Sequence, residues 1–68
     1  MRDRTDVMAE LNSMGGFETT VREYGTEDCL SIPLTEPIGK YETSQIRQAG
    51  YEIAYTDTTN NEIVLEPQ

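Results

Sequence analysis

The sequence predicts a small α+β domain in which two antiparallel β-hairpins and two short helices follow one another in the order α-β-β-α-β-β. Two pairs of alternating apolar segments are each separated by turn residues, which is the pattern of a β-hairpin. A segment that favours a helix precedes each pair. The chain has 68 residues, enough for one domain at most, so residues 1–68 are expected to form a single small domain.

The first helix is expected within residues 4–16. Three apolar residues recur at i, i+4 and i+7 and therefore share one face: Val7, Leu11 and Met14. Asp3 or Thr5 can cap the start of the helix by accepting a hydrogen bond from a backbone N–H group. The Gly15-Gly16 pair is expected to end the helix, because glycine adopts the left-handed conformation without a Cβ clash.

The first hairpin is expected between residues 17 and 34. In the first strand, residues 17–24, one face carries Phe17, Thr19 and Val21. Gly25 begins the turn, because glycine permits a positive φ angle. In the second strand, one face carries Leu30, Ile32 and Leu34. Pro33 lacks a backbone donor, so its side of the strand end is expected at an edge or already outside the ladder.

The second helix is expected from Lys40 to Ala49. Pro37 and Gly39 argue against one continuous helix from residue 35 onward, and Gly50 is expected to end it. Its buried side is marked by Ile46 and Ala49, with Tyr41 at the margin.

The second hairpin is expected over residues 51–67. Asn60-Asn61 tolerate positive φ angles and supply the turn. The face expected to be apolar carries Tyr51, Ile53, Tyr55, Ile63 and Leu65. The opposite face, expected to meet water, carries Glu52, Ala54 and Thr56.

The charge of the chain is lopsided. Acidic residues outnumber basic ones by 13 to 5, the formal net charge is −8, and Lys40 is the only lysine. One interpretation is a soluble acidic surface that prevents aggregation. Scarce lysine with abundant Asp, Glu and Thr also indicates a halophilic protein, from a halophile or its virus. Mimicry of nucleic-acid phosphates needs a dense row of carboxylates, whereas these are scattered.

The residue types disfavour an enzyme. The chain has no histidine and a single cysteine, Cys29, so it can form no internal disulfide and lacks the usual zinc ligands. A catalytic thiol needs a neighbouring base, so Cys29 is expected to be structural. We expect no catalytic residue, no cofactor and no metal. The segment DTTNNE, residues 57–62, lacks the ligand pattern of a calcium loop, so we expect a solvated turn there, with a weak cation site as the alternative.

No stretch of the sequence favours a membrane. None reaches the ~18 apolar residues that a spanning helix needs. The N-terminal segment MRDRTDVMAEL is charged and lacks a long apolar run, unlike a secretory signal. We therefore expect a cytoplasmic protein that makes no membrane contact.

The segment from Val21 to Pro67 resembles the AbrB/MazE-like swapped-hairpin domains. The resemblance rests on VREYGTEDCLSIP and on NEIVLEP, with Gly25, the Ile32-Pro33 pair and Ile63 to Pro67 in comparable places. The segment LTEPIGKYE separates the Ile-Pro pair from the helix, which in the family begins almost at that pair. The resemblance implies an intertwined dimer that binds DNA or a partner toxin. The basic residues that would contact DNA are Arg22, Lys40 and Arg47.

These observations predict a small acidic, non-enzymatic protein–protein interaction module that forms a homodimer. A chain this short has a marginal core, and with disulfides and zinc excluded, self-association is the remaining support. Part of the apolar face of the second hairpin, or the exposed edge of the last strand, is expected to meet a second copy. The interface candidates are Tyr51, Ile53, Tyr55, Ile63 and Leu65. The alternative is an AbrB/MazE-like DNA-binding regulator or antitoxin, in which case the partner is nucleic acid.

Overall fold

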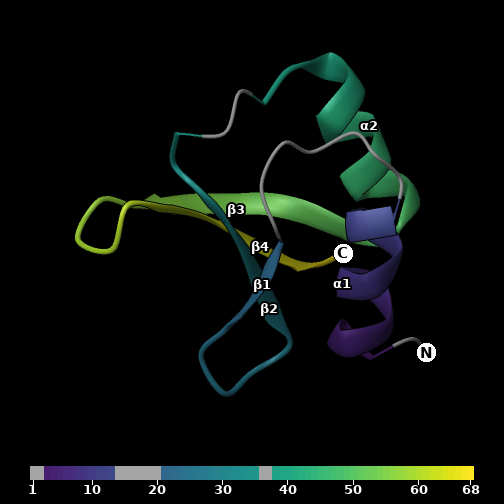
Figure 1. Ribbon diagram of the computed structural model, residues 1–68, viewed down its shortest axis with the longest axis horizontal. Coiled ribbons are helices and arrows are strands. Elements are labelled where there is room, and N and C mark those ends of the chain that lie inside the picture. The colour runs from purple at the N-terminus through teal and green to yellow at the C-terminus, as the bar shows by residue number, and fades with distance from the viewer. Residues whose placement is uncertain (1–2, 14–20, 36–37) are drawn as a thin grey trace.

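The computed structural model describes residues 3–13, 21–35 and 38–68, and it confirms the predicted order of elements (Figure 1). The elements are α1 (Arg4–Ser13), β1 (Arg22–Tyr24), β2 (Cys29–Pro33), α2 (Lys40–Gln48), β3 (Tyr51–Asp57) and β4 (Glu62–Pro67). The predicted α+β fold with two antiparallel hairpins is therefore confirmed.

The four strands form one antiparallel sheet in the order β1-β2-β4-β3. The two hairpins are joined through β2 and β4, where Leu30 pairs with Leu65 and Ile32 pairs with Ile63. The last strand, β4, thus lies between β2 and β3. The prediction that the last strand has an exposed edge was wrong, because the long edge of the sheet belongs to β3.

Both helices pack against the same face of the sheet. In Figure 1 the two helices lie next to each other at the right, and the turn between β3 and β4 projects away from them to the left. The core combines helix and sheet residues: Val7, Leu11, Val21, Leu30, Ile32, Ile46, Ala49, Tyr51 and Leu65. Because each short helix is unstable alone in water, this shared apolar layer holds both of them in place.

The start of α1 is capped by Asp3, one of the two predicted caps. Its Oδ1 atom accepts a 3.0 Å hydrogen bond from the backbone N–H of Asp6. Val7 and Leu11 are buried as predicted, whereas Met14 and the Gly15-Gly16 pair lie outside the described residues. Together these contacts fix where α1 begins and which side faces the core.

The end of α1 is tied to the start of the first hairpin. The Asn12 side chain accepts a 2.7 Å hydrogen bond from the Val21 N–H and donates one of 3.2 Å to the Val21 carbonyl. Val21 is fully buried. Strand β1 covers residues 22–24 of the predicted strand, and residues 17–20 lie outside the described part of the chain.

Arg4 joins α1 to the turn of the first hairpin. Its Nη1 atom donates to four backbone carbonyls, those of Tyr24, Gly25, Glu27 and Cys29. Its Nε atom lies 3.3 Å from Oε2 of Glu23, and the Arg4 side chain is 20% exposed. Gly25 has a φ angle of +66°, as its place in the turn predicted. Arg4 therefore supplies hydrogen-bond donors to carbonyl groups of the turn and of the two strand ends beside it.

Pro33 ends β2 without breaking the sheet. The next N–H group, on Leu34, donates to the Asn61 carbonyl at 2.8 Å, on the β4 side. Because backbone groups along a strand alternate in direction, the Pro33 nitrogen points toward β1, whose pairing with β2 ends at Ser31. Pro33 is therefore outside the ladder on its donor side, as predicted. Leu34, expected on the same strand face as Leu30 and Ile32, lies beyond β2 and is 38% exposed.

Helix α2 begins at Lys40 as predicted and ends at Gln48, with Ala49 as its C-cap. Oε1 of Glu42 accepts a 2.7 Å hydrogen bond from the Gly39 N–H and so closes the first turn. Gly50, with a φ angle of +91°, follows the last turn. The predicted buried side is confirmed, since Ile46 and Ala49 are 0% and 5% exposed.

A β-bulge in β3 changes the faces of the second hairpin. Ile53 pairs with Leu65, but the next pair is Tyr55 with Val64, so one residue of β3 is left over between them. Because side chains alternate along β4, Tyr55 lies on the opposite face from Ile53 and Leu65. The prediction of one apolar face for all five residues was therefore wrong. Thr56, which pairs with Ile63, moves to the helix-covered face for the same reason.

Candidate functional site

Strand β3 forms a seven-residue edge of the sheet. No strand within the described residues pairs with its outer side. The start of the strand is already hydrogen-bonded within the chain, because the Tyr51 carbonyl accepts a 3.1 Å hydrogen bond from Nε2 of Gln68. Beyond it, Ile53 and Tyr55 are 41% and 54% exposed. Strand β3 thus presents backbone groups and two large apolar side chains at the same edge.

The structure separates the five predicted interface residues. Tyr51 and Leu65 are 3% and 0% exposed and belong to the core of the chain itself, so they are not available to a partner. Ile63 is half-buried against that core. Ile53 and Tyr55 remain accessible, on opposite faces of the edge strand.

The face of the sheet opposite the helices carries no helix within the described residues. We call it the helix-free face. By the strand register it carries Arg22, Tyr24, Cys29, Ser31, Pro33, Glu52, Tyr55, Asp57, Glu62, Val64 and Glu66. Four of these side chains are carboxylates and one is an arginine, so the face is acidic.

A hydrogen bond between Tyr24 and Asp57 crosses the helix-free face. The Tyr24 hydroxyl on β1 donates to Oδ2 of Asp57 on β3 at 2.6 Å. In a flat sheet these two strands would be about 14 Å apart, three strand spacings, which is more than the two side chains span. The sheet therefore curls toward this face. The bond passes over the paired residues Ser31 and Val64, which are 1% and 0% exposed.

The bond also changes how both groups titrate. Hydrogen bonding to the Asp57 carboxylate, and second to the Tyr55 hydroxyl, raises the pKa of Tyr24 well above its ordinary value. The Tyr24 hydroxyl, followed by the Asn60 side chain, lowers the pKa of Asp57. Asp57 is therefore charged and Tyr24 neutral throughout the physiological range, which are the states that this bond needs.

The turn DTTNNE uses Asp57 as its organising residue. The Asp57 carboxylate also accepts hydrogen bonds from the Asn60 side chain at 2.8 Å and from the backbone N–H groups of Thr59 and Asn60 at 3.1 and 3.2 Å. Asn61 has the predicted positive φ angle, +56°. Donors of the chain itself occupy this carboxylate, and no group of three or more metal-ligating side chains occurs among residues 3–13, 21–35 and 38–68.

Cys29 lies half-buried at the start of β2. Burial, and then the nearby charges of Glu27 and Glu66, raise the pKa of its thiol. A raised pKa keeps the thiol protonated at neutral pH, and the thiol form is a poor nucleophile.

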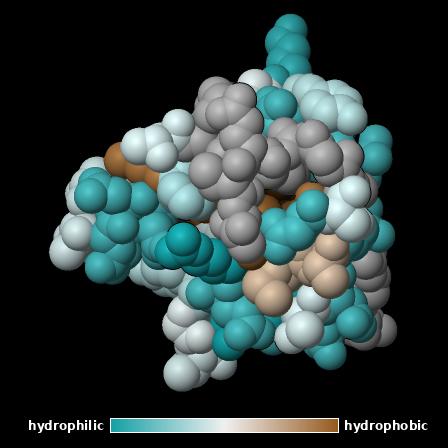
Figure 2. All heavy atoms as spheres, viewed as in Figure 1, coloured by the Kyte–Doolittle hydropathy of each residue, from teal (hydrophilic) through white to brown (hydrophobic). Residues whose placement is uncertain are grey.

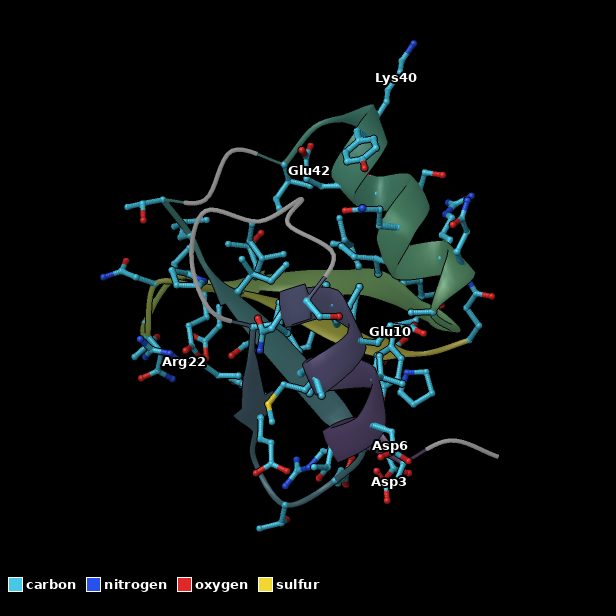
Figure 3. All side chains as sticks on the ribbon, turned by 45° about the vertical axis from the view of Figure 1, so that its right-hand side comes forward. Asp3, Asp6, Glu10, Arg22, Lys40 and Glu42 are labelled. Carbon is cyan, nitrogen blue, oxygen red and sulfur yellow. The ribbon has the colours of Figure 1, made fainter. Side chains whose placement is uncertain are left out.

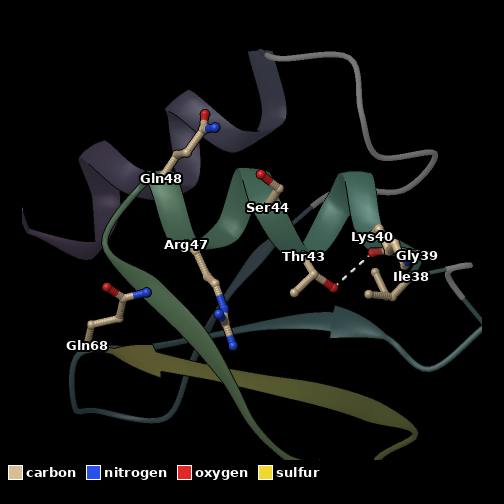
Figure 4. A pocket seen from close by; sticks show the side chains of 8 residues that line it. All are labelled: Ile38, Gly39, Lys40, Thr43, Ser44, Arg47, Gln48 and Gln68. Atoms are coloured by element: carbon tan, nitrogen blue, oxygen red, sulfur yellow. Dashed lines mark hydrogen bonds between the residues drawn. The ribbon is translucent and has the colours of Figure 1, made fainter.

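The three basic residues proposed for DNA contact fall on two sides of the molecule. Lys40 stands at the tip of α2, whereas Arg22 lies at β1, far from it (Figure 3). Lys40 and Arg47 line one open hollow of about 850 Å³ beside α2 (Figure 4). The other lining residues carry no charged side chain: Ile38, Gly39, Thr43, Ser44, Gln48 and Gln68.

Sequence reasoning missed two features of this site. The first feature is the contact between Arg4 and the first hairpin turn. A basic residue at the start of a helix is unfavourable beside the helix dipole, and this could have indicated that Arg4 binds another part of the chain. The bond between Tyr24 and Asp57 had no local signal, because 33 positions separate its two residues.

Searches against family models, curated proteins and solved structures found no match for this chain. The resemblance to the swapped-hairpin domains therefore stays a prediction. Among the described residues, neither helix has the length and apolar character that a membrane span requires. The described surface in Figure 2 is mostly hydrophilic, with small apolar areas between polar ones.

Proposed function

We propose that this chain is a non-enzymatic protein–protein interaction module that forms a homodimer through the edge of β3. The observation that carries the proposal is the seven-residue edge strand with Ile53 and Tyr55 exposed on it. Exposed edges of this length invite pairing with another strand, because their backbone N–H and C=O groups are available.

The bulge gives this edge an apolar side chain on each face. Ile53 lies on the helix-covered face and Tyr55 on the helix-free face. A strand added at this edge would therefore cover one large apolar side chain above the sheet and another below it. Such burial adds a favourable term to the backbone hydrogen bonds.

Two copies of β3 would close the assembly. Antiparallel pairing of two identical strands follows a two-fold axis, so the same surface serves both copies. The outer edges of the joined sheet would then be the two β1 strands, each of three residues in the described part of the chain. Very short edge strands limit further addition, so a dimer is favoured over a fibre.

The test is Ile53→Asp, followed by sedimentation velocity. An aspartate at the paired edge places an uncompensated charge in the interface, so we expect a monomer at concentrations where the parent is a dimer. Tyr41→Asp is the matched control, because Tyr41 is 63% exposed but lies on α2. Circular dichroism should show the fold unchanged in both variants. Leu65→Asp is unsuitable, since Leu65 is fully buried and the charge would unfold the chain.

A DNA-binding regulator or antitoxin is the second candidate, and the hollow beside α2 favours it. Lys40 and Arg47 line that hollow, and no other described residue that lines it has a carboxylate side chain. Fluorescence polarisation with duplex DNA at several salt concentrations tests this candidate, because phosphate contacts make affinity fall steeply with salt. Binding that is lost in Arg47→Gln would support the regulator, and no binding at low salt would exclude it.

A further inference from the structure

The helix-free face contains directly opposed carboxylates. Glu52 on β3 pairs with Glu66 on β4, and Asp57 pairs with Glu62 in the same ladder. Like charges directly opposite in a sheet are destabilising. Asp57 is compensated by its four hydrogen bonds, but no described basic side chain forms an ion pair with Glu52 or Glu66. The pair at this end of the sheet therefore lacks its compensating positive charge.

A hollow of about 650 Å³ adjoins this pair. It is lined by Thr26, Glu27, Asp28, Cys29, Glu66 and Pro67. Three of these residues are carboxylates and none is basic. The guanidinium of Arg4, the nearest basic group to this turn, is already bonded to the backbone carbonyls of the turn and to Glu23. The hollow and the Glu52–Glu66 pair together form an acidic end of the helix-free face.

The same face continues to an exposed aromatic ring and an incomplete polar site. Tyr55, 54% exposed, lies three residues along β3 from Glu52, about 10 Å in an extended strand. Below the bond between Tyr24 and Asp57, Oγ of Ser31 is buried and has no hydrogen-bond partner. The Ser31 hydroxyl is enclosed beneath that bond and is 1% exposed, and Tyr55 belongs to the β3 edge, so the acidic end is the part of this face that is open to a partner.

We propose that the helix-free face docks an extended basic segment of a partner protein. Its arginine or lysine side chains would lie between Glu52 and Glu66 and in the adjoining hollow. The inference rests on the proposed role as a protein-binding module, but it does not depend on the dimer through β3.

Charge complementarity selects this occupant. The chain has a net charge of −8 and this face has four carboxylates against Arg22, so a basic partner is attracted. A second copy placed on the face would bring the same carboxylates opposite themselves. A metal ion needs ligands gathered at bonding distance, and no such group occurs within the described residues. Cations carried on long, separate side chains fit this spacing better.

Fluorescence polarisation with a labelled peptide, acetyl-Arg-Gly-Arg-Gly-Arg-amide, tests the proposal. Alternate arginines of an extended peptide point to one side, about 7 Å apart. We expect micromolar binding in buffered 0.15 M salt, and binding about fivefold weaker for Glu66→Gln, the upper range for an exposed ion pair. Asp6→Asn removes the same charge from α1 and should leave binding unchanged. A peptide with citrulline in place of arginine should not bind.

A second readout separates docking from a structural role. Glu66→Gln relieves the opposition to Glu52, so it should raise the thermal midpoint of the protein alone while it weakens peptide binding. A lowered midpoint would assign Glu66 to the fold and contradict the proposal. Four results would each overturn the docking proposal. Two concern specificity: an equal loss of binding in Asp6→Asn, and binding of the citrulline peptide. The other two are displacement of the peptide by millimolar Mg²⁺ and no binding at millimolar peptide. Ile53→Asp should bind the peptide normally, so failure of the dimer leaves this result interpretable.

Discussion

The Tyr24 hydroxyl donates a 2.6 Å hydrogen bond to Oδ2 of Asp57 and thereby joins the two outer strands of the sheet across its helix-free face. The bond encloses Ser31 and Val64 beneath it. It also holds Asp57 in the position from which its other oxygen accepts the Thr59 and Asn60 N–H groups of the second turn. One bond therefore couples the curl of the sheet to the geometry of the second hairpin.

Tyr24→Phe should lower the thermal midpoint, because it removes this bond and leaves the ring in place. Tyr41→Phe is the control, since Tyr41 is 63% exposed and should tolerate the change. Differential scanning calorimetry of both variants beside the parent measures the effect. Equal midpoints for the parent and Tyr24→Phe would show that the bond adds nothing.

The difference between the parent and Tyr24→Phe should depend on pH. The pKa of Asp57 is lowered in the folded state, so its contribution is present above the ordinary value near 4 and is lost as pH falls through the folded pKa. The pKa of Tyr24 is raised, so its contribution is present below about 10 and is lost as pH rises through the folded pKa. Melting curves from pH 3 to pH 11 should show a difference that is constant near neutrality and shrinks at both ends. A difference that grows at either end would contradict this assignment.

Arg4→Gln should lower the free energy of unfolding by about 2 kcal/mol, the range for hydrogen bonds to a charged group. The Arg4 side chain is 20% exposed and satisfies carbonyls of the first turn. Arg22→Gln removes the same charge from an exposed position on β1 and should change the free energy of unfolding little. Urea titration compares the two variants, and equal losses would show that net charge rather than the carbonyl contacts is responsible.

The fold should become more stable as salt screens repulsion among the acidic residues, if the acid excess is an adaptation to high salt. We expect a higher thermal midpoint in ~2 M than in ~0.1 M KCl, concentrations that bracket the screening range. Sucrose of matched osmolality is the control for general solvent effects. A midpoint that is flat or lower at the higher KCl concentration would remove the halophilic interpretation.

Cys29→Ser should leave association and peptide binding intact and lower the free energy of unfolding by about 1 kcal/mol, as for a half-buried conservative change. The raised pKa of the thiol fits a structural role. Sizing and peptide binding of the variant check this expectation. A folded variant that has lost either interaction would show that the thiol itself takes part in recognition.

The sequence predicted the elements better than their arrangement, for physical reasons. Local signals determined the helix and turn ends, as the positive φ angles of Gly25, Gly50 and Asn61 confirm. Spacing also placed Val7, Leu11 and Ile46 in the core. These predictions depend on residues within a few positions of one another.

Features that depend on long-range packing escaped prediction. The β-bulge in β3 carries no glycine or other signal in YEIAYTD, and it moved Tyr55 to the other face. The place of β4 inside the sheet follows from its pairing with β2, more than 25 positions away. Tyr51 and Leu65, two of the predicted interface residues, pack into the core of the chain itself, which also depends on contacts between distant segments.

Multi-angle light scattering of the parent protein over a wide concentration range, at low and high salt, tests dimerisation through the β3 edge. We expect a mass that rises from one chain to two and then stays constant, because pairing through the β3 edge closes on itself. The protein concentration at which half of the chains are dimeric should decrease as salt screens the repulsion between two acidic copies. A mass of one chain at every concentration and salt would contradict the dimer, and a mass that continues to grow would contradict its closure.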